Sequence, residues 1–108
     1  MELTPQEAAD RVEAGDADLV DVREPYEWDA GHIEGARHVP LPELAEFAQT
    51  LDPARPVVFV CRVGGRSAMA TDAFRRAGFQ AYNLAGGVLA WERSGLPFTG
   101  SVALHGVL

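Results

Sequence analysis

The sequence predicts an α/β fold with a central parallel β-sheet and helices on both faces. Three observations support this class. Short apolar runs lack polar alternation, as in parallel strands buried on both faces. Segments with helical spacing are bounded by glycine and proline, and the two kinds of segment alternate along the chain. With 108 residues, of which 47% are hydrophobic, the chain fits one domain over residues 1–108.

The first predicted helix lies in the segment TPQEAADRVEAG. Thr4 suits the N-cap, and Glu7 follows at the spacing of a capping box. Pro5 suits the first helical position, and Gly15 is expected to end the helix. Residues 19–22 then predict a short buried strand.

The middle of the chain is expected to be less regular. Glycines and prolines interrupt residues 26–42, so we expect only one helical turn, near Glu27, and a short strand at 37–39. A second helix is predicted over residues 42–51. Residues 57–60, with the sequence VVFV, are β-branched or aromatic and predict the central strand.

A longer helix is predicted in the segment RSAMATDAFRRAGF, ending at Gly78. QAYNLAGG then predicts a strand and turn, and VLAWERSGLP predicts a last helix. The tail FTGSVALHGVL is apolar enough to pack on the domain. The side chains expected to face inward from the long helix are Ala68, Met69, Ala73 and Phe74.

Charge and composition exclude several kinds of partner. The formal net charge of −7 argues against nucleic acid. Residues 1–52 carry fourteen acids and three arginines, whereas residues 53–108 carry two acids and six arginines. No apolar run approaches the roughly 20 residues that span a bilayer, so no membrane partner is expected. The single cysteine cannot form an internal disulfide, which predicts a cytoplasmic protein.

Cys61 is the strongest candidate for a reactive residue. It falls at the carboxyl end of the predicted central strand, where open α/β sheets bind ligands. The next segment can turn its backbone N–H groups and a helix N-terminus toward one anion. Such a cradle favours a thiolate and predicts that Cys61 is a nucleophile. The predicted cradle consists of Arg62, Val63, Gly64, Gly65, Arg66 and Ser67.

Three stretches together resemble rhodanese-type sulfurtransferases of the single-domain form. They are LVDVREPYEWDAGHIEGARHVP, VVFVCRVGGRSAMA and GFQAYNLAGGVLAWERSGLP. The resemblance implies that Cys61 takes a sulfane sulfur from a donor such as thiosulfate, releases sulfite and holds a persulfide. A thiol, including one on a protein, or cyanide then removes the sulfur. It implies no separate cofactor, since the sulfur is carried on Cys61.

Two other functions share this site. One is a sulfur carrier or redox-regulatory module that turns over small donors slowly. The other is a cysteine phosphatase of related fold. Such phosphatases place one residue more before the arginine that binds phosphate, whereas four residues separate Cys61 from Arg66 here and Ser67 follows. The loop also lacks a carboxylate for acid catalysis, so the sequence favours sulfur transfer over phosphatase activity.

The sequence also predicts roles for the two arginines of the loop and for one charged pair outside it. Arg62 and Arg66 are expected to attract an anionic donor, and Arg66 could instead brace the loop. Asp21 and Arg23 are expected to give structural support, as an ion pair at a strand end or through hydrogen bonds to nearby loops.

The remaining polar and aromatic residues predict structure rather than chemistry. His32 and His38 lack partners at metal-ligand spacing, so no metal is expected and they should fix loops or be exposed. The pair Gly86–Gly87 lacks the lysine of a phosphate-binding loop, so it is expected to form the turn between a strand and a helix. Trp28 and Trp91 are expected in the core or a pocket wall.

Overall fold

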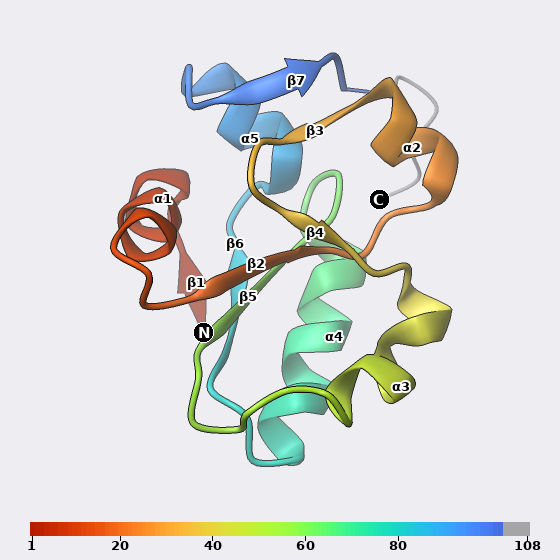
Figure 1. Cartoon of the computed structure of the whole chain (residues 1–108). Helices are drawn as coiled ribbons and strands as arrows, with labels where there is room; N and C mark the ends of the chain where they lie inside the picture. Colours follow the sequence, from red (N-terminus) through yellow and green to blue (C-terminus); the bar gives the residue numbers. More distant parts are fainter. Residues whose placement is uncertain (103–108) are drawn as a thin grey trace.

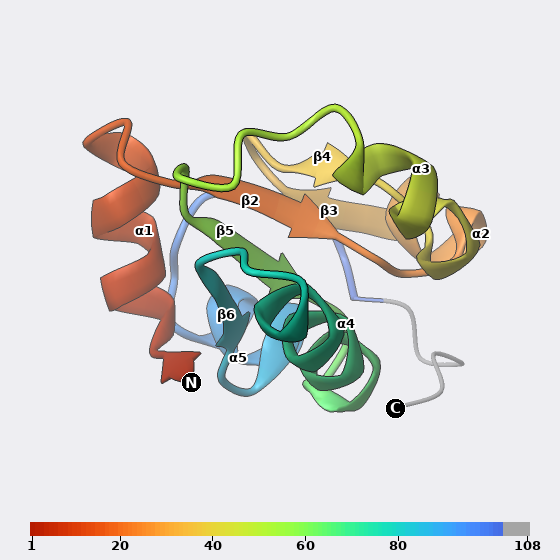
Figure 2. The same cartoon turned by 90° about the horizontal axis from the view of Figure 1, so that it is seen from below.

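A five-stranded parallel sheet forms the centre of the computed structural model, which describes residues 1–102 (Figure 1). Its strands, in spatial order, are β1 (Glu2–Leu3), β6 (Ala81–Leu84), β5 (Val57–Val60), β2 (Asp18–Asp21) and β4 (Arg37–His38). Figure 2 shows β2 and β5 side by side and running in the same direction. The predicted central strand is therefore central, with β6 on one side and β2 on the other.

Helices cover both faces of this sheet, which confirms the predicted α/β class. One layer contains α1 (Pro5–Glu13) and α5 (Gly87–Arg93), and the other contains α3 (Leu44–Ala48) and α4 (Gly65–Arg76) (Figure 1). The shorter α2 (Pro25–Ala30) follows β2. The capping box predicted for the first helix is present at Thr4.

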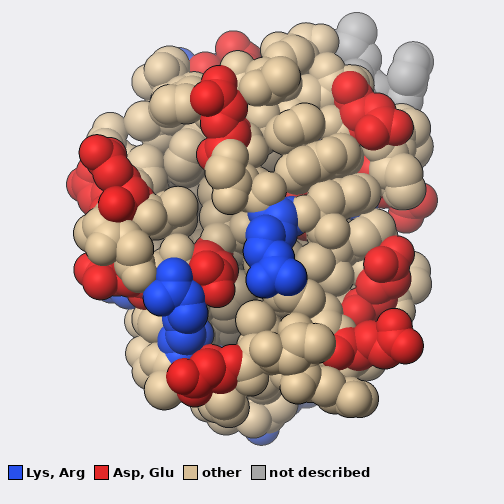
Figure 3. Space-filling view, viewed as in Figure 1, with Lys and Arg blue, Asp and Glu red and all other residues tan. Residues whose placement is uncertain are grey.

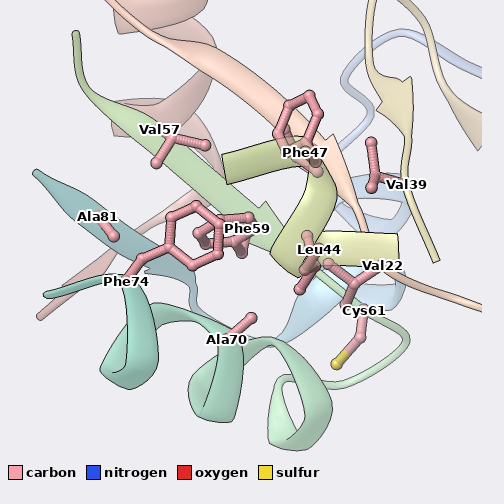
Figure 4. Close-up of a cluster of buried hydrophobic side chains, with 11 residues drawn as sticks. Val22, Val39, Leu44, Phe47, Val57, Phe59, Cys61, Ala70, Phe74 and Ala81 are labelled. Carbon is pink, nitrogen blue, oxygen red and sulfur yellow. The ribbon is translucent and has the colours of Figure 1, made fainter. Parts of the chain in front are cut away.

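Strand β5 contributes to both hydrophobic clusters because its side chains alternate between the two faces. Val57 and Phe59 pack beneath α3 and α4, whereas Val58 and Val60 pack beneath α1 and α5. All four are buried, as the continuous apolar run predicts. Figure 4 shows that Cys61 belongs to the first of these clusters.

A small antiparallel sheet closes one end of the molecule. It pairs β3 (Gly31–Ile33) with β7 (Phe98–Gly100), segments far apart in the sequence. The sequence analysis did not identify either strand or β1, because each has only two or three residues and no periodicity can be read from it. Val102 packs against the core, as expected for the tail, and residues 103–108 lie outside the described part.

The predicted inward face of α4 was largely wrong. Of the four apolar residues expected there only Phe74 is buried, and Met69 is 63% exposed. The buried face instead includes two hydroxyl side chains, Ser67 and Thr71. These are satisfied internally, because Thr71 donates to the Ser67 carbonyl oxygen at 2.8 Å and Ser67 contacts Cys61. Apolar periodicity predicts the wrong buried face of a helix when polar side chains are buried and form hydrogen bonds inside the fold.

The helix predicted over 42–51 is shorter than expected. A 3₁₀ turn, η1 (Leu41–Glu43), precedes α3, which ends at Ala48. The Thr50 hydroxyl donates to the Phe47 carbonyl oxygen at 2.7 Å. This local bond offers the backbone an alternative to further helix.

The charged side chains are spread over the surface. Figure 3 shows acidic groups at intervals over one face, with few basic groups between them. This distribution fits the solvation of an acidic chain better than a single docking patch. None of the helices within residues 1–102 is both long and apolar enough to cross a membrane.

Which face of α4 is buried can be tested by truncating one buried and one exposed side chain. Phe74→Ala is expected to lower the free energy of unfolding by about 3 kcal/mol or more, because it leaves a cavity beside Phe59 and Phe79. Met69→Ala, on the exposed side, is expected to change it by less than about 0.5 kcal/mol. Urea unfolding of both variants measures the difference, and equal losses would contradict this facing.

Candidate active site

Cys61 follows the last residue of β5, and its side chain is buried with 0% exposure. Its sulfur accepts hydrogen bonds from Gly64 N at 3.1 Å and Ser67 N at 3.4 Å, and the Ser67 hydroxyl lies 3.2 Å away. In Figure 4 the sulfur points toward the first turn of α4. The loop thus turns back on its own cysteine and presents donors to the sulfur, an arrangement that suits a sulfur anion.

The two glycines of the loop have different roles. Gly64 has a φ of +119°, a conformation that other residues rarely adopt. Gly65 is the first residue of α4 and is absent from the glycines with positive φ. Only Gly64 therefore uses the conformational freedom of glycine, since the backbone of Gly65 is helical.

Arg66 forms a bidentate ion pair with Glu27 of α2, with N···O distances of 2.7 and 2.9 Å. Glu27 has 0% exposure and also accepts a hydrogen bond from Glu24 N. Of the two roles expected for Arg66, this geometry fits the brace, since the guanidinium ties the start of α4 to α2. The sequence analysis missed Glu27 as its partner, although Glu24 and Glu27 have capping-box spacing.

The buried pair shifts the ionisation of both partners. Burial raises the pKa of Glu27, but hydrogen bonds from Arg66 and Glu24 N, with the positive charges nearby, outweigh it and leave the pKa below its ordinary value. The hydrogen bonds that Arg66 itself donates to Glu27 raise the pKa of Arg66. Both groups are therefore charged at neutral pH.

Asn83 of β6 is a second residue that the sequence analysis missed. Its side-chain nitrogen donates to the Gly64 carbonyl oxygen and to a Glu2 carboxylate oxygen, both at 3.2 Å. Its side-chain oxygen lies 2.6 Å from the Ser67 hydroxyl. The only sequence signal was a polar residue within the otherwise apolar strand AYNL.

The first turn of α5 holds the other side of the loop. Val88 N donates to the Cys61 carbonyl oxygen at 2.8 Å, and Leu89 N donates to the Arg62 carbonyl oxygen at 3.2 Å. A side chain at Gly87 would collide with both carbonyl groups. The glycine pair turns β6 into α5, as predicted, and its second member also permits this close approach.

Asp21 and Arg23 form an ion pair with both side chains fully buried. Arg23 also donates to the Gly31 carbonyl oxygen at 2.7 Å, and so joins the end of β2 to β3. These contacts match the structural role expected for the pair. Within residues 1–102, neither the Asp21 nor the Arg23 side chain is hydrogen-bonded to the Cys61 sulfur.

The two tryptophans and the histidines near Arg23 also make contacts that hold loops in place. Trp28 stacks on His32 and His38, with ring centroids 3.8 and 4.8 Å apart. His32 lies 2.9 Å from the Trp28 carbonyl oxygen, and His38 lies 2.8 Å from that of Arg23. Trp91 is buried and donates to the Pro97 carbonyl oxygen. The described residues contain no group of three or more His, Cys, Asp or Glu that could hold a metal ion.

The fold and loop together define the class: an α/β domain with one cysteine at the carboxyl edge of a parallel sheet, in a loop whose N–H groups point at the cysteine sulfur. Comparisons with known proteins agree. A family model of the rhodanese-like domain matches residues 4–94. This chain therefore belongs to the rhodanese-like domain family, which confirms the resemblance found in the sequence.

Individual relatives give the extent of the match. The probable adenylyltransferase/sulfurtransferase MoeZ of Mycobacterium tuberculosis is 40% identical over 99 residues, covering 88% of this chain and 25% of MoeZ. The thiosulfate sulfurtransferase GlpE of Pseudomonas aeruginosa is 37% identical over 91 residues, covering 83% of this chain and 82% of GlpE. A rhodanese-related protein from Thermoplasma volcanium superposes with a TM-score of 0.82 at 25% identity, covering 93% and 98% of the two chains. This chain thus spans about a quarter of the length of MoeZ.

The close approach at Gly87 can be tested with a matched glycine. Gly87 and Gly15 both have positive φ, but a side chain at Gly15 meets nothing within 4 Å. Gly15→Ala is expected to cost about 1 kcal/mol of stability from backbone strain alone. Gly87→Ala is expected to cost about 3 kcal/mol, because it also pushes α5 away from the loop. Chemical denaturation measures both, and equal costs would contradict the packing argument.

The ion pair between Glu27 and Arg66 predicts a pH-dependent contribution to stability. Because the pKa of Glu27 is lowered in the folded chain, the pair stabilises fully above its ordinary value of 4.5 and loses this effect as pH falls through the folded pKa. Glu27→Gln should therefore be about 3 kcal/mol less stable than the wild type at neutral pH.

The difference between the two proteins should shrink as the pH falls below 4.5 and through the lowered pKa of Glu27. Urea unfolding at several pH values measures it. A difference that stays constant across the range would show that the charge of Glu27 is not the source of the stability.

Proposed function

We propose that this chain is a sulfurtransferase that carries sulfur as a persulfide on Cys61, with thiosulfate as the donor. The Cys61 thiolate attacks the sulfane sulfur, the S–S bond of thiosulfate breaks, and sulfite leaves with the bonding electron pair. An acceptor thiolate then attacks the outer sulfur of the persulfide. The acceptor departs with that sulfur bonded to it, and the Cys61 thiolate is regenerated.

The observation that carries this proposal is the set of three donors around the Cys61 sulfur. Gly64 N, Ser67 N and the Ser67 hydroxyl lie within 3.4 Å of it. The two backbone N–H groups are fixed before the reaction, so they stabilise the negative charge of the thiolate, and afterwards that of the persulfide, with little rearrangement. The names of MoeZ and GlpE support sulfur transfer, and that of GlpE supports thiosulfate.

The negative charge of the sulfur donor indicates which residues of the loop would attract it. Arg62 lies half-buried in the loop and would draw an anionic donor toward it, while Arg66 braces the loop through Glu27. The acceptor would be a thiol, on a small molecule or on a protein. Neither a dissociable cofactor, a metal, a nucleic acid nor a membrane enters the proposed reaction. We place it in the cytoplasm, where Cys61 would stay reduced.

The pairing of Arg66 with Glu27 disfavours the phosphatase. A phosphate-binding arginine directs a pair of N–H donors at the substrate, but the end-on pair of Arg66, on Nη1 and Nη2, is bonded to a buried carboxylate. Sulfur transfer needs no such clamp, because the sulfur atom that moves is bonded to Cys61.

The decisive experiment is the intact mass of the chain after incubation with thiosulfate. The wild type is expected to gain one sulfur atom, and Cys61→Ser is expected to gain none. With cyanide present, thiocyanate should form over many turnovers and should be absent with the serine variant. Bound sulfur without turnover would indicate a carrier module, hydrolysis of an aryl phosphate would indicate a phosphatase, and no bound sulfur would refute sulfur transfer.

A further inference from the structure

The Ser67 hydroxyl has one proton and three acceptors around it. Its oxygen lies 2.6 Å from Asn83 Oδ1, 3.2 Å from the Cys61 sulfur and 3.3 Å from the Gly64 carbonyl oxygen. A hydroxyl can donate to only one of them at a time. The cysteine sulfur therefore competes for this proton, and Asn83 is the nearest competitor.

The orientation of the Asn83 side chain follows from its other contacts. One end of the amide lies 3.2 Å from both the Gly64 carbonyl oxygen and a Glu2 carboxylate oxygen. These two groups only accept hydrogen bonds, so the NH₂ group must lie at that end. The amide oxygen then faces Ser67 and can only accept the hydroxyl proton.

We propose that Asn83 is a positioning residue that sets how readily Cys61 ionises, by competing with the cysteine sulfur for the hydroxyl proton of Ser67. The inference rests on the proposed function in that Cys61 is the reacting group. While Cys61 is a thiol, its S–H can donate to the Ser67 oxygen and Ser67 can donate to Asn83. Every polar atom of this chain of contacts is then satisfied.

Ionisation of Cys61 breaks this arrangement. When the thiol proton leaves to water, the Ser67 hydroxyl must turn to the thiolate to stabilise it. Asn83 Oδ1 and the Ser67 oxygen then lie close together with no proton between them, which costs free energy. Asn83 therefore favours the neutral thiol, whereas the amides of Gly64 and Ser67 favour the thiolate.

The competition is expected to act on the free thiol and not on the loaded enzyme. In a persulfide the inner sulfur has no proton and the outer sulfur carries the charge, so Ser67 can keep its bond to Asn83. Replacing residue 83 alters none of the titratable and charged groups around the site themselves, and within residues 1–102 only Glu2 among them is hydrogen-bonded to Asn83 directly. These groups are Tyr26 and Glu27 of α2, Arg62 and Arg66 of the loop and α4, Glu2 of β1, and the Asp21–Arg23 pair.

The test is the rate of Cys61 alkylation by iodoacetamide as a function of pH, measured on the full chain. Asn83→Leu removes the competing acceptor at similar volume. Its pH profile is expected to move by about one pH unit toward acid, which is about a tenfold faster reaction below the midpoint. Thr71→Val is the matched control, because it also removes a buried hydrogen bond at Ser67 but leaves the hydroxyl proton alone.

A second variant should shift the profile the other way. Asn83→Asp, combined with Glu2→Gln so that the new amide can donate to the new carboxylate, gives a stronger acceptor and adds negative charge. Its profile is expected to move toward higher pH relative to Glu2→Gln alone. This pair carries the test if Asn83→Leu does not fold.

The hydroxyl itself is tested in a Ser67→Ala background, where Asn83→Leu should no longer move the profile. Slower alkylation at every pH with an unchanged midpoint would overturn the proposal and leave Asn83 a structural role only. A shift that persists without the Ser67 hydroxyl would also overturn it. Alkylation reports the thiol whether or not Cys61 accepts sulfur, so failure here is separate from failure of the mass experiment.

Discussion

The burial of the Cys61 sulfur is the constraint on which the rest of the site depends. A sulfur anion without solvent must be stabilised by donors from the protein, and the nearest are the backbone N–H groups of the residues that follow it. The chain must therefore turn back sharply after β5 and enter α4 with those groups directed at the sulfur. The positive φ of Gly64 makes this turn possible.

Such a loop does not hold its shape alone, and three different elements fix it. Helix α2 supplies the carboxylate of Glu27 for Arg66, β6 supplies the amide of Asn83 for Gly64, and α5 donates two backbone N–H groups to carbonyls at the start of the loop. Each tie comes from a distant part of the sequence. The loop around Cys61 thus depends on the whole domain for its shape, although its own residues are contiguous.

Two polar side chains of the loop, those of Arg66 and Ser67, have different kinds of partner. A guanidinium committed to a buried carboxylate supports the backbone and leaves charge attraction to other groups, as for Arg66. The hydroxyl of Ser67 has a different position, since it belongs both to the sulfur cradle and to the contacts of Asn83. The direction of that one O–H bond therefore decides which of the two neighbours is hydrogen-bonded.

The sequence by itself determined the fold class, the central strand, the first helix cap and the place of Cys61 at a strand end, because these depend on local periodicity and chain order. It could not identify Glu27 or Asn83 as partners of the loop, since their local signals, capping-box spacing and a polar residue in an apolar strand, do not show which distant group each one meets. It also assigned the wrong face to α4, because Ser67 and Thr71 look like surface residues until their partners are known. Tertiary structure decided these points for one physical reason: burying a polar group is tolerated only where a distant segment supplies its hydrogen bond.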